Sequence, residues 1–95
     1  MAFPLHNETI GDLSDSARDM HLAVITYLEN VERIRWYDQR IQACLDEDLR
    51  AILKHNRDQQ MTAAAMVLEW IHRQDSVVDQ ELRDYLFAEK QIARH

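Results

Sequence analysis

Two long stretches of sequence decide the fold: residues 17–43 (ARDMHLAVITYLENVERIRWYDQRIQA) and residues 49–74 (LRAILKHNRDQQMTAAAMVLEWIHRQ). In each stretch, apolar residues recur at steps of three and four, which places them on one face of an α-helix. The first stripe comprises Ala17, Met20, Val24, Tyr27, Leu28, Val31, Ile34 and Ile41. The second comprises Leu49, Ile52, Leu53, Asn56, Gln60, Ala63, Val67 and Trp70. The spacing predicts helices over about residues 16–43 and 47–74.

The residues at the ends of these stretches predict where the helices begin. Ser14 and Ser16 are alternative N-caps of the first helix, and Asp46 is the expected N-cap of the second. A break near residues 74–76 is followed by a third, shorter stripe: Val78, Leu82, Tyr85, Leu86 and Ile92. We therefore expect an irregular lead over residues 1–13 and a single helical hairpin domain, with a short third helix, over residues 14–95.

The composition agrees with an all-α protein and excludes several functional classes. The 95 residues include one Gly and one Pro, too few turn residues for a β fold. One Cys rules out an intramolecular disulfide and a cysteine-built zinc site. The net charge of −6 disfavours nucleic acid and anionic membranes as partners. Because there is neither a membrane span nor a segment that resembles a secretory signal, we expect a soluble cytoplasmic protein.

The apolar faces are wide, which predicts that the hairpin does not act alone. Two helices of equal length with a short connection form an antiparallel pair. Such a pair buries only one seam, which is marginal for so short a chain. We expect two hairpins to join into a four-helix bundle. A third helix that folds back to complete a three-helix monomer is the alternative.

Two pairs of polar residues on the second helix have the i, i+3 spacing that can bring side chains together. Glu69-x-x-His72 matches the generic carboxylate–imidazole pair of iron-binding bundles. Its place near the end of the helix, where a cationic His is favoured, supports a structural role instead. For His55 and Asp58, a hydrogen bond along the helix surface is the favoured interpretation.

Glu29 and Glu32 form a third pair, at the centre of the first helix. Two carboxylates one turn apart repel unless a cation lies between them. Arg33 and Arg35 are close in sequence, which favours a solvated face. The functional interpretation is a divalent ion held by such pairs from two subunits.

Other residues carry weaker signals. Asn56 and Gln60 interrupt the apolar stripe of the second helix, and we expect a polar layer that sets the register across the dimer seam. Trp36 and Tyr37 form an aromatic pair typical of a core or an interface. Cys44 has no Cys-x-x-Cys partner and is expected to be an inert thiol at the helix junction.

Several strings with consistent spacing make the chain resemble the encapsulated ferritin family. They are Trp36-Tyr37-Asp38-Gln39-Arg40, His55-Asn56-Arg57-Asp58, Ala64-Ala65-Met66 leading into Leu68-Glu69-Trp70, and Tyr85-Leu86-Phe87. The resemblance covers residues 17–90. It implies hairpins that dimerise into a ferritin-like four-helix bundle and assemble as a ring-shaped decamer. It also implies Fe(II) oxidation at the dimer interface and iron storage inside an encapsulin shell.

The chain departs from the family pattern where iron would bind. The family's ligands are a Glu on the first helix and a Glu-x-x-His on the second. Aligned through the strings above, these positions hold Asn30, Gln60 and Ala63. A neutral amide cannot offset the charge of a di-iron centre and Ala offers no ligand, so we expect no catalytic residue there.

Four neighbours of those positions keep the family's residue types. Glu29 and Glu32 match carboxylates near the route by which iron enters, and are the weak metal candidates. Trp36 and Tyr37 match the aromatic pair beside the iron site. No cofactor is assigned, and iron or another divalent metal is the candidate. Because no residues after the third apolar stripe resemble the shell-targeting peptide, we do not expect one in this sequence.

Three functional hypotheses follow. The first is an encapsulated-ferritin-like protein with lost or weakened ferroxidase activity and a structural or regulatory role. The second is an active iron-binding ferroxidase with a variant site that uses Glu29, Glu32 and Tyr37. The third is a helical interaction module that needs no metal. The expected partners are a second copy, a ring-shaped decamer and an encapsulin compartment, and mixed rings with a ligand-complete relative are an alternative.

Overall fold

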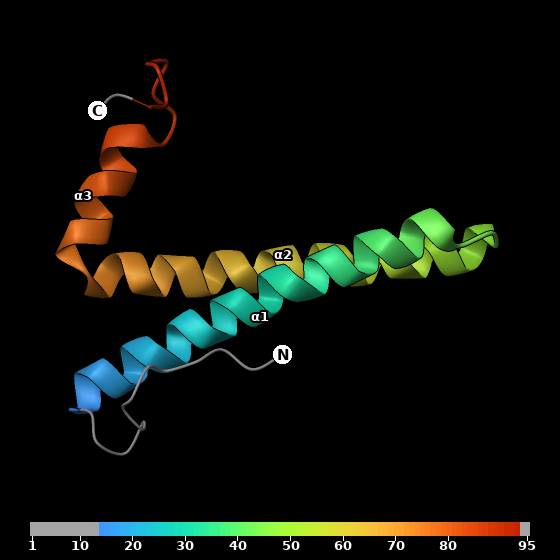
Figure 1. The fold of residues 1–95 in the computed structure, drawn as a ribbon, viewed down its shortest axis with the longest axis horizontal. Helices are drawn as coiled ribbons and strands as arrows, with labels where there is room; N and C mark the ends of the chain where they lie inside the picture. The colour runs from blue at the N-terminus through green and yellow to red at the C-terminus, as the bar shows by residue number, and fades with distance from the viewer. Residues whose placement is uncertain (1–13, 94–95) are drawn as a thin grey trace.

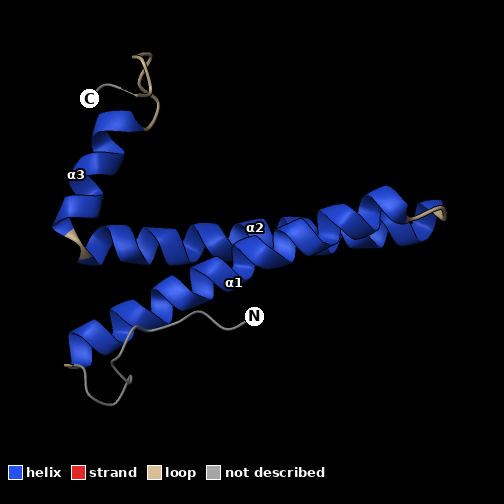
Figure 2. Ribbon diagram, viewed as in Figure 1, coloured by secondary structure: helices blue, strands red, loops and turns tan. Residues whose placement is uncertain are grey.

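The structure, a computed structural model, describes residues 14–93, which form three α-helices with short connections (Figures 1 and 2). Helix α1 spans Asp15–Ala43, α2 spans Glu47–Gln74 and α3 spans Ser76–Tyr85. The described residues contain no strand, so the predicted all-α class is confirmed. The irregular lead predicted over residues 1–13 lies outside the described residues.

The first helix begins and ends as its terminal residues dictate. Of the two candidate caps it is Ser14 that lies in the extended conformation, and its Oγ accepts a hydrogen bond from the Ala17 N–H at 3.3 Å. Ser16 lies inside the first turn, so α1 starts one residue earlier than predicted. Cys44 ends the helix, and its N–H donates to the Ile41 carbonyl at 3.4 Å.

The connection between α1 and α2 is three residues long and is held by polar contacts. The Asp46 side chain accepts a hydrogen bond from the Leu49 N–H at 2.8 Å, which confirms it as the N-cap of α2. The Arg50 guanidinium donates to the Cys44 carbonyl across the turn. The Cys44 thiol donates to the Asp46 carbonyl at 3.3 Å, so it lies at the junction as expected.

Helices α1 and α2 run antiparallel, side by side near the turn, and separate toward the end where α1 begins (Figure 1). An ion pair between Asp38 Oδ1 and Arg57 Nη1, 3.1 Å apart, joins the two helices in the half nearer the turn. It fixes the level at which residues of one helix lie opposite residues of the other. The predicted hairpin is therefore present.

The hairpin has very little interior of its own. Among the described residues, the buried apolar side chains are Ala64 and Ile71, and the buried polar one is Asn30. No large side chain in residues 14–93 is fully buried. Large apolar residues remain exposed on both long helices, and Leu28, Val31, Ile52, Met66 and Trp70 are among them. Because burial of apolar surface is the main favourable term in folding, this hairpin is suited to pack against further protein.

The third helix leaves the hairpin at a sharp corner built on Asp75. The Asp75 N–H donates to the Ile71 carbonyl at 3.0 Å and so ends α2. The Asp75 carboxylate accepts from the Val77 N–H at 2.9 Å and the Val78 N–H at 3.1 Å, and so begins α3. Helix α3 then points away from the hairpin axis and contacts α2 but not α1 within the described chain (Figure 1). The alternative three-helix monomer is therefore not formed.

The third helix is shorter than its apolar stripe suggested. It ends at Tyr85, with Leu86 as C-cap, and the following Phe87 has φ of 60°. A non-glycine residue in the left-handed region stops the helix, so Ile92 lies beyond it and is exposed.

In residues 14–93, no helix is both long enough and apolar enough to cross a membrane.

Candidate functional site

The three positions aligned with iron ligands lie in the central part of the hairpin. Asn30 is on the face of α1 that packs against α2, and only 5% of it is exposed. Gln60 and Ala63 are half-buried one turn apart on α2. The Gln60 Oε1 atom is buried and accepts no hydrogen bond from the described residues. The structure thus offers two amides and a methyl group at this level of the hairpin.

These side chains do not fit a di-iron centre. Ferritin-like sites use a Glu from each of two helices and Glu-x-x-His motifs, and the anionic oxygens offset the charge of the metal. Amide oxygens are neutral, and Ala63 supplies no donor atom. In the part of the chain that the structure describes, no group of three or more His, Cys, Asp or Glu side chains could hold a metal ion.

The two metal candidates of the sequence are each paired with an arginine. Glu29 lies 3.6 Å from Arg33 Nη2. Glu32, whose side chain is 17% exposed, accepts a hydrogen bond from Arg35 Nε at 3.2 Å and forms an ion pair with Arg35 Nη2. The hydrogen bond from Arg35 holds the pKa of Glu32 below its ordinary value of 4.5. A cation bound here would have to compete with guanidinium groups that already neutralise both carboxylates.

The aromatic pair beside this position is held by local partners. A smaller contribution to the lowered pKa of Glu32 comes from a hydrogen bond with Trp36. The guanidinium of Arg40 lies over the ring of Tyr37, 5.7 Å from its centroid, which is a cation–π contact. Trp36 is more exposed than Tyr37. Trp36 and Tyr37 thus each have a partner one turn away on α1, Glu32 and Arg40 respectively.

One ion pair between the two helices was not predicted, although both of its residues belong to the strings that carry the family resemblance. Asp38 belongs to the first string and Arg57 to the second, and they form the ion pair that joins α1 to α2. Arg57 Nε also lies 3.2 Å from Asp58. Asp58 thus has the adjacent arginine as a partner, and the hydrogen bond between His55 and Asp58 stays a prediction. Part of the family signature thus serves to fix the hairpin.

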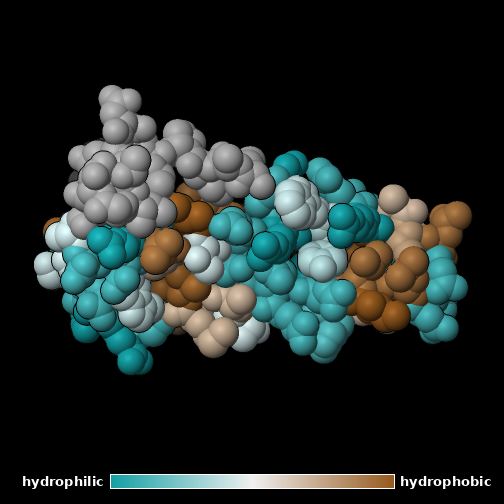
Figure 3. All heavy atoms as spheres, turned by 90° about the horizontal axis from the view of Figure 1, so that it is seen from below, coloured by the Kyte–Doolittle hydropathy of each residue, from teal (hydrophilic) through white to brown (hydrophobic). Residues whose placement is uncertain are grey.

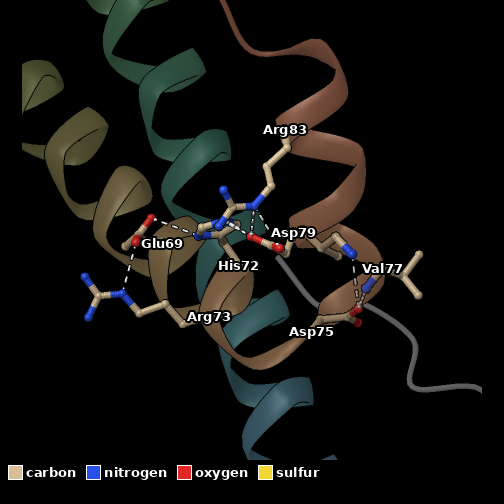
Figure 4. A network of polar contacts seen from close by, with 8 residues as sticks. Glu69, His72, Arg73, Asp75, Val77, Asp79 and Arg83 are labelled. Atoms are coloured by element: carbon tan, nitrogen blue, oxygen red, sulfur yellow. Dashed lines mark hydrogen bonds and ion pairs between the residues drawn. The ribbon is translucent and has the colours of Figure 1, made fainter.

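A second polar cluster joins α2 to α3, at the opposite end of α2 from the turn (Figure 4). His72 Nδ1 lies 3.3 Å from Glu69 Oε2, and His72 Nε2 contacts the carboxylate of Asp79 on α3. Each carboxylate also contacts an arginine: Arg73 Nε is 3.0 Å from Glu69, and Arg83 Nε is 3.0 Å from Asp79. The pattern Glu69-x-x-His72 is thus part of a network of polar contacts near the helix end, which agrees with a structural role.

Apolar side chains gather at two places on one face of the molecule, with hydrophilic residues between them (Figure 3). Near the open end, a hollow of about 300 Å³ is lined by Leu22, Ala23, Thr26, Met66, Val67 and Trp70. Near the turn, a second hollow of about 490 Å³ is lined by apolar residues that include Ala43, Leu49 and Leu53. Leu45, in the turn itself, is 93% exposed. Along each helix, the positions aligned with iron ligands lie between these two apolar regions: Asn30 on α1, and Gln60 and Ala63 on α2.

The family model described as EncFtn-like matches residues 5–89 of this chain. The chain belongs to the EncFtn-like family. The encapsulated ferritin-like protein of Rhodospirillum rubrum is 42% identical over 86 residues, which are 90% of this chain and 61% of that protein. The chain thus spans less than two thirds of that relative. The ferritin-like protein of Thermotoga maritima is 41% identical over 87 residues, 92% of this chain and 76% of that protein.

A solved structure supports the same EncFtn-like assignment at the level of the fold. The crystal structure of protein ne0167 from Nitrosomonas europaea matches with a TM-score of 0.87 and 49% identity, over 96% of this chain and 100% of that one. The resemblance to encapsulated ferritins and the ferritin-like helical fold are therefore confirmed.

Proposed function

We propose that this EncFtn-like chain keeps the family's mode of assembly but has lost, or greatly weakened, ferroxidase activity. Its role is then structural or regulatory within an iron-storage assembly. The proposal rests chiefly on the donor chemistry at the centre of the hairpin, where Asn30, Gln60 and Ala63 stand at the aligned ligand positions. The arginine pairing of Glu29 and Glu32 supports it, because the remaining carboxylates already have cationic partners.

Without metal, replacement of the carboxylate ligands by amides should stabilise the folded protein. Carboxylates buried close together without a metal repel and must be taken out of water, which is costly. Amides at Asn30 and Gln60 remove that penalty, although a buried amide still requires hydrogen-bond partners. The acceptor Gln60 Oε1 has none among residues 14–93. A donor from a second chain would satisfy it, and would make the polar layer part of the dimer seam.

Assembly is the part of the proposal with the widest physical support. The hairpin leaves Leu22, Met66 and Trp70 exposed around one hollow, and the chain's own core is minimal. Membership of the EncFtn-like family implies oligomerisation and association with an encapsulin in general terms. We infer a homodimer that forms a four-helix bundle, and a ring-shaped decamer built from such dimers. An encapsulin compartment in the cytoplasm is the corresponding location.

Restoring the iron ligands tests directly whether their loss explains the proposed loss of ferroxidase activity. The triple variant Asn30→Glu, Gln60→Glu, Ala63→His places carboxylates and an imidazole where the aligned iron ligands would be. We expect the purified variant to bind about one pair of iron ions per dimer, as ferritin-like bundles do. Bound iron is counted by elemental analysis after gel filtration, beside the wild-type chain, which should bind little.

The matched control carries the same residue types at positions turned outward. Gln59→Glu and Thr62→His are on exposed positions of α2, with the same i, i+3 spacing. This variant should retain no more iron than the wild type. If the triple variant forms the native oligomer and binds no iron, the alignment of ligand positions is wrong and the proposal fails.

The alternative is an active ferroxidase with a variant site at Glu29, Glu32 and Tyr37. Its carboxylates exist, but each is held by an arginine one turn away, and Tyr37 is covered by Arg40. Among residues 14–93, they are not part of any group of three or more His, Cys, Asp or Glu side chains that could hold a metal ion. We therefore rank it second, and iron oxidation by the wild-type chain decides between the two.

A further inference from the structure

The face that carries the two apolar hollows shows the same order of features from either end (Figure 3). An apolar hollow lies near the open end, hydrophilic side chains follow, and a second apolar hollow lies near the turn. On α2, Trp70 in the first hollow is ten residues after Gln60, and Leu49 in the second is eleven residues before it. At the usual rise of a helix, both are about 15 Å from Gln60. A surface of this kind can pair with a copy of itself turned end for end.

The middle of this face contains a polar atom that the described chain does not satisfy. Gln60 Oε1 is buried and accepts no hydrogen bond from residues 14–93. Asn30 on α1 lies at the same level, because the two residues are equally far in sequence from Leu45 in the turn. A buried amide needs partners for its acceptor and for its donors. Another amide offers both, so a second copy of Gln60 opposite the first would satisfy it through a reciprocal pair of N–H···O bonds.

Two charged residues of α1 are placed in the same symmetrical way. Asp19 lines a hollow with Trp70 at the open end, and Arg40 lines the hollow near the turn. Both are exposed, and neither forms an ion pair within residues 14–93. Asp19 is eleven residues before Asn30 and Arg40 is ten residues after it, so turning one chain end for end brings its Arg40 level with Asp19 of the other. Pairing of like ends would instead bring together charges of the same sign, which repel.

The shape of the hairpin favours the same orientation. Because α1 and α2 lie close together near the turn and separate toward the open end, the hairpin is a wedge (Figure 1). Packed end for end, the narrow turn of one chain lies against the wide end of the other. The hollow of Leu22, Met66 and Trp70 then receives apolar side chains of the other chain at the level of Leu49, which is 48% exposed. Leu45 is farther from Gln60 than Trp70 is, and so falls beyond this contact.

We propose that two copies of this chain pair end for end around a two-fold axis at Gln60, where their Gln60 amides hydrogen-bond to each other. Arg40 of each chain pairs with Asp19 of the other, near the two ends of the interface. The pair forms without metal, because neutral amides leave no buried charge that a cation must offset. This inference rests on the homodimer of the proposed function, and adds its orientation, its centre and its independence of metal.

Exchange of the two charges tests the orientation. The dissociation constant of the dimer is measured by sedimentation of the whole chain in buffer with EDTA. Asp19→Arg and Arg40→Asp should each weaken dimerisation about tenfold, because each turns two attractions per dimer into two repulsions. The double variant restores opposite charges across the interface and should dimerise within about twofold of the wild type. Glu81→Arg and Lys54→Asp make the same kinds of change at exposed positions away from this face, and should leave the dissociation constant unchanged.

Gln60→Glu tests the centre of the interface. The substitution places two carboxylates opposite each other in the seam, so in EDTA it should weaken dimerisation about tenfold or more. Gln39→Glu makes the same chemical change at an exposed position of α1 and should dimerise like the wild type. Circular dichroism checks that each variant remains helical, so that a loss of dimer is not a loss of fold.

The outcomes separate this inference from the proposed function. A wild-type chain that dimerises only after metal is added keeps the homodimer but overturns the metal-independent pair. If either single charge reversal dimerises like the wild type, or the double variant stays as weak as the single ones, the chains are not arranged end for end. A Gln60→Glu variant that dimerises as tightly as the wild type in EDTA overturns the amide pair. A chain that is monomeric in every condition overturns both this inference and the proposed assembly, whereas iron oxidation alone decides the loss of ferroxidase activity.

Discussion

At the scale of the residue, Arg35 decides what Glu32 can do. Its hydrogen bond holds the pKa of Glu32 low, so Glu32 stays ionised but already has a cationic partner. We predict that Arg35→Gln raises the pKa of Glu32 toward 4.5. The sign follows because removal of a cation disfavours the ionised form. An NMR titration of the Glu32 carboxyl carbon measures this directly.

The matched control for that substitution is Arg33→Gln. Arg33 pairs with Glu29 and contributes nothing to the lowered pKa of Glu32. The substitution Arg33→Gln should therefore leave the titration of Glu32 unchanged. An unchanged midpoint in Arg35→Gln would show that Arg35 is not the partner in solution, and would return Glu32 to the set of candidate metal ligands.

The candidate site residues could be named from the sequence, but not all of their partners could. The substitutions at Asn30, Gln60 and Ala63 could be recognised because flanking strings fixed the alignment. The pairing of Glu32 with Arg35 was within reach, since i, i+3 neighbours share a helix face. The ion pair between Asp38 and Arg57 was not, because apolar periodicity says which face is buried and nothing about the level at which two helices meet.

At the scale of the element, Asp75 is the residue on which the start of α3 depends. Its carboxylate accepts hydrogen bonds from two N–H groups that would otherwise have no partner in the helix. We predict that Asp75→Ala destabilises α3 by about 1 kcal/mol, the usual effect of removing an N-cap. Hydrogen exchange resolved by residue should then show about fivefold lower protection over Ser76–Tyr85.

Ser76→Ala serves as the comparison for Asp75→Ala, because Ser76 is exposed and adjacent but is not the cap. Protection in α3 should be little changed by it, and protection in the middle of α2 should be unchanged by either substitution. Equal losses of protection in both variants would mean that the cap does not limit the stability of α3.

The long helices were predictable because cap residues and stripes agree, and both predicted ends of α2 match the structure. The third helix was overestimated for a physical reason. Leu86 and Ile92 continue the apolar spacing, but the backbone at Phe87 takes a positive φ that no side-chain pattern reveals. The direction of α3 also could not be read from sequence, because it depends on Asp75 and on the contact of His72 with Asp79.

At the scale of the whole molecule, the exposed apolar face should hold two chains together. Trp70 lines the hollow that also contains Leu22 and Met66. We predict that Trp70→Glu weakens dimerisation about tenfold or more, because aromatic residues near the centre of an interface usually dominate its energy. Sedimentation velocity over a range of concentrations measures the shift toward the monomer, and circular dichroism confirms that the helices persist.

Leu45→Glu tests whether any apolar-to-charged change would have the same effect. Leu45 is 93% exposed in the turn, away from that hollow. The substitution Leu45→Glu should therefore leave the dimer intact. A wild-type chain that sediments as a monomer, or a Trp70→Glu variant that assembles like the wild type, would contradict the proposed interface.

Fold class and family could be predicted from the sequence because the strings and the helical periodicity extend over nearly the whole chain. The dimer, the ring and the shell stay predictions, because they depend on surfaces that pair between chains. The exposed apolar residues say that a partner is needed, but their pattern alone does not choose between a dimer and a larger ring.

The central claim, that this EncFtn-like chain is a weakened or silent ferroxidase, is tested most directly by aerobic oxidation of Fe(II). Purified wild-type protein is mixed with Fe(II) in air, the rate is compared with buffer, and bound iron is then counted per chain. We predict oxidation no faster than in buffer and little bound iron, because the aligned ligand positions hold Asn30, Gln60 and Ala63. Saturable oxidation with about one iron pair per dimer would contradict the account.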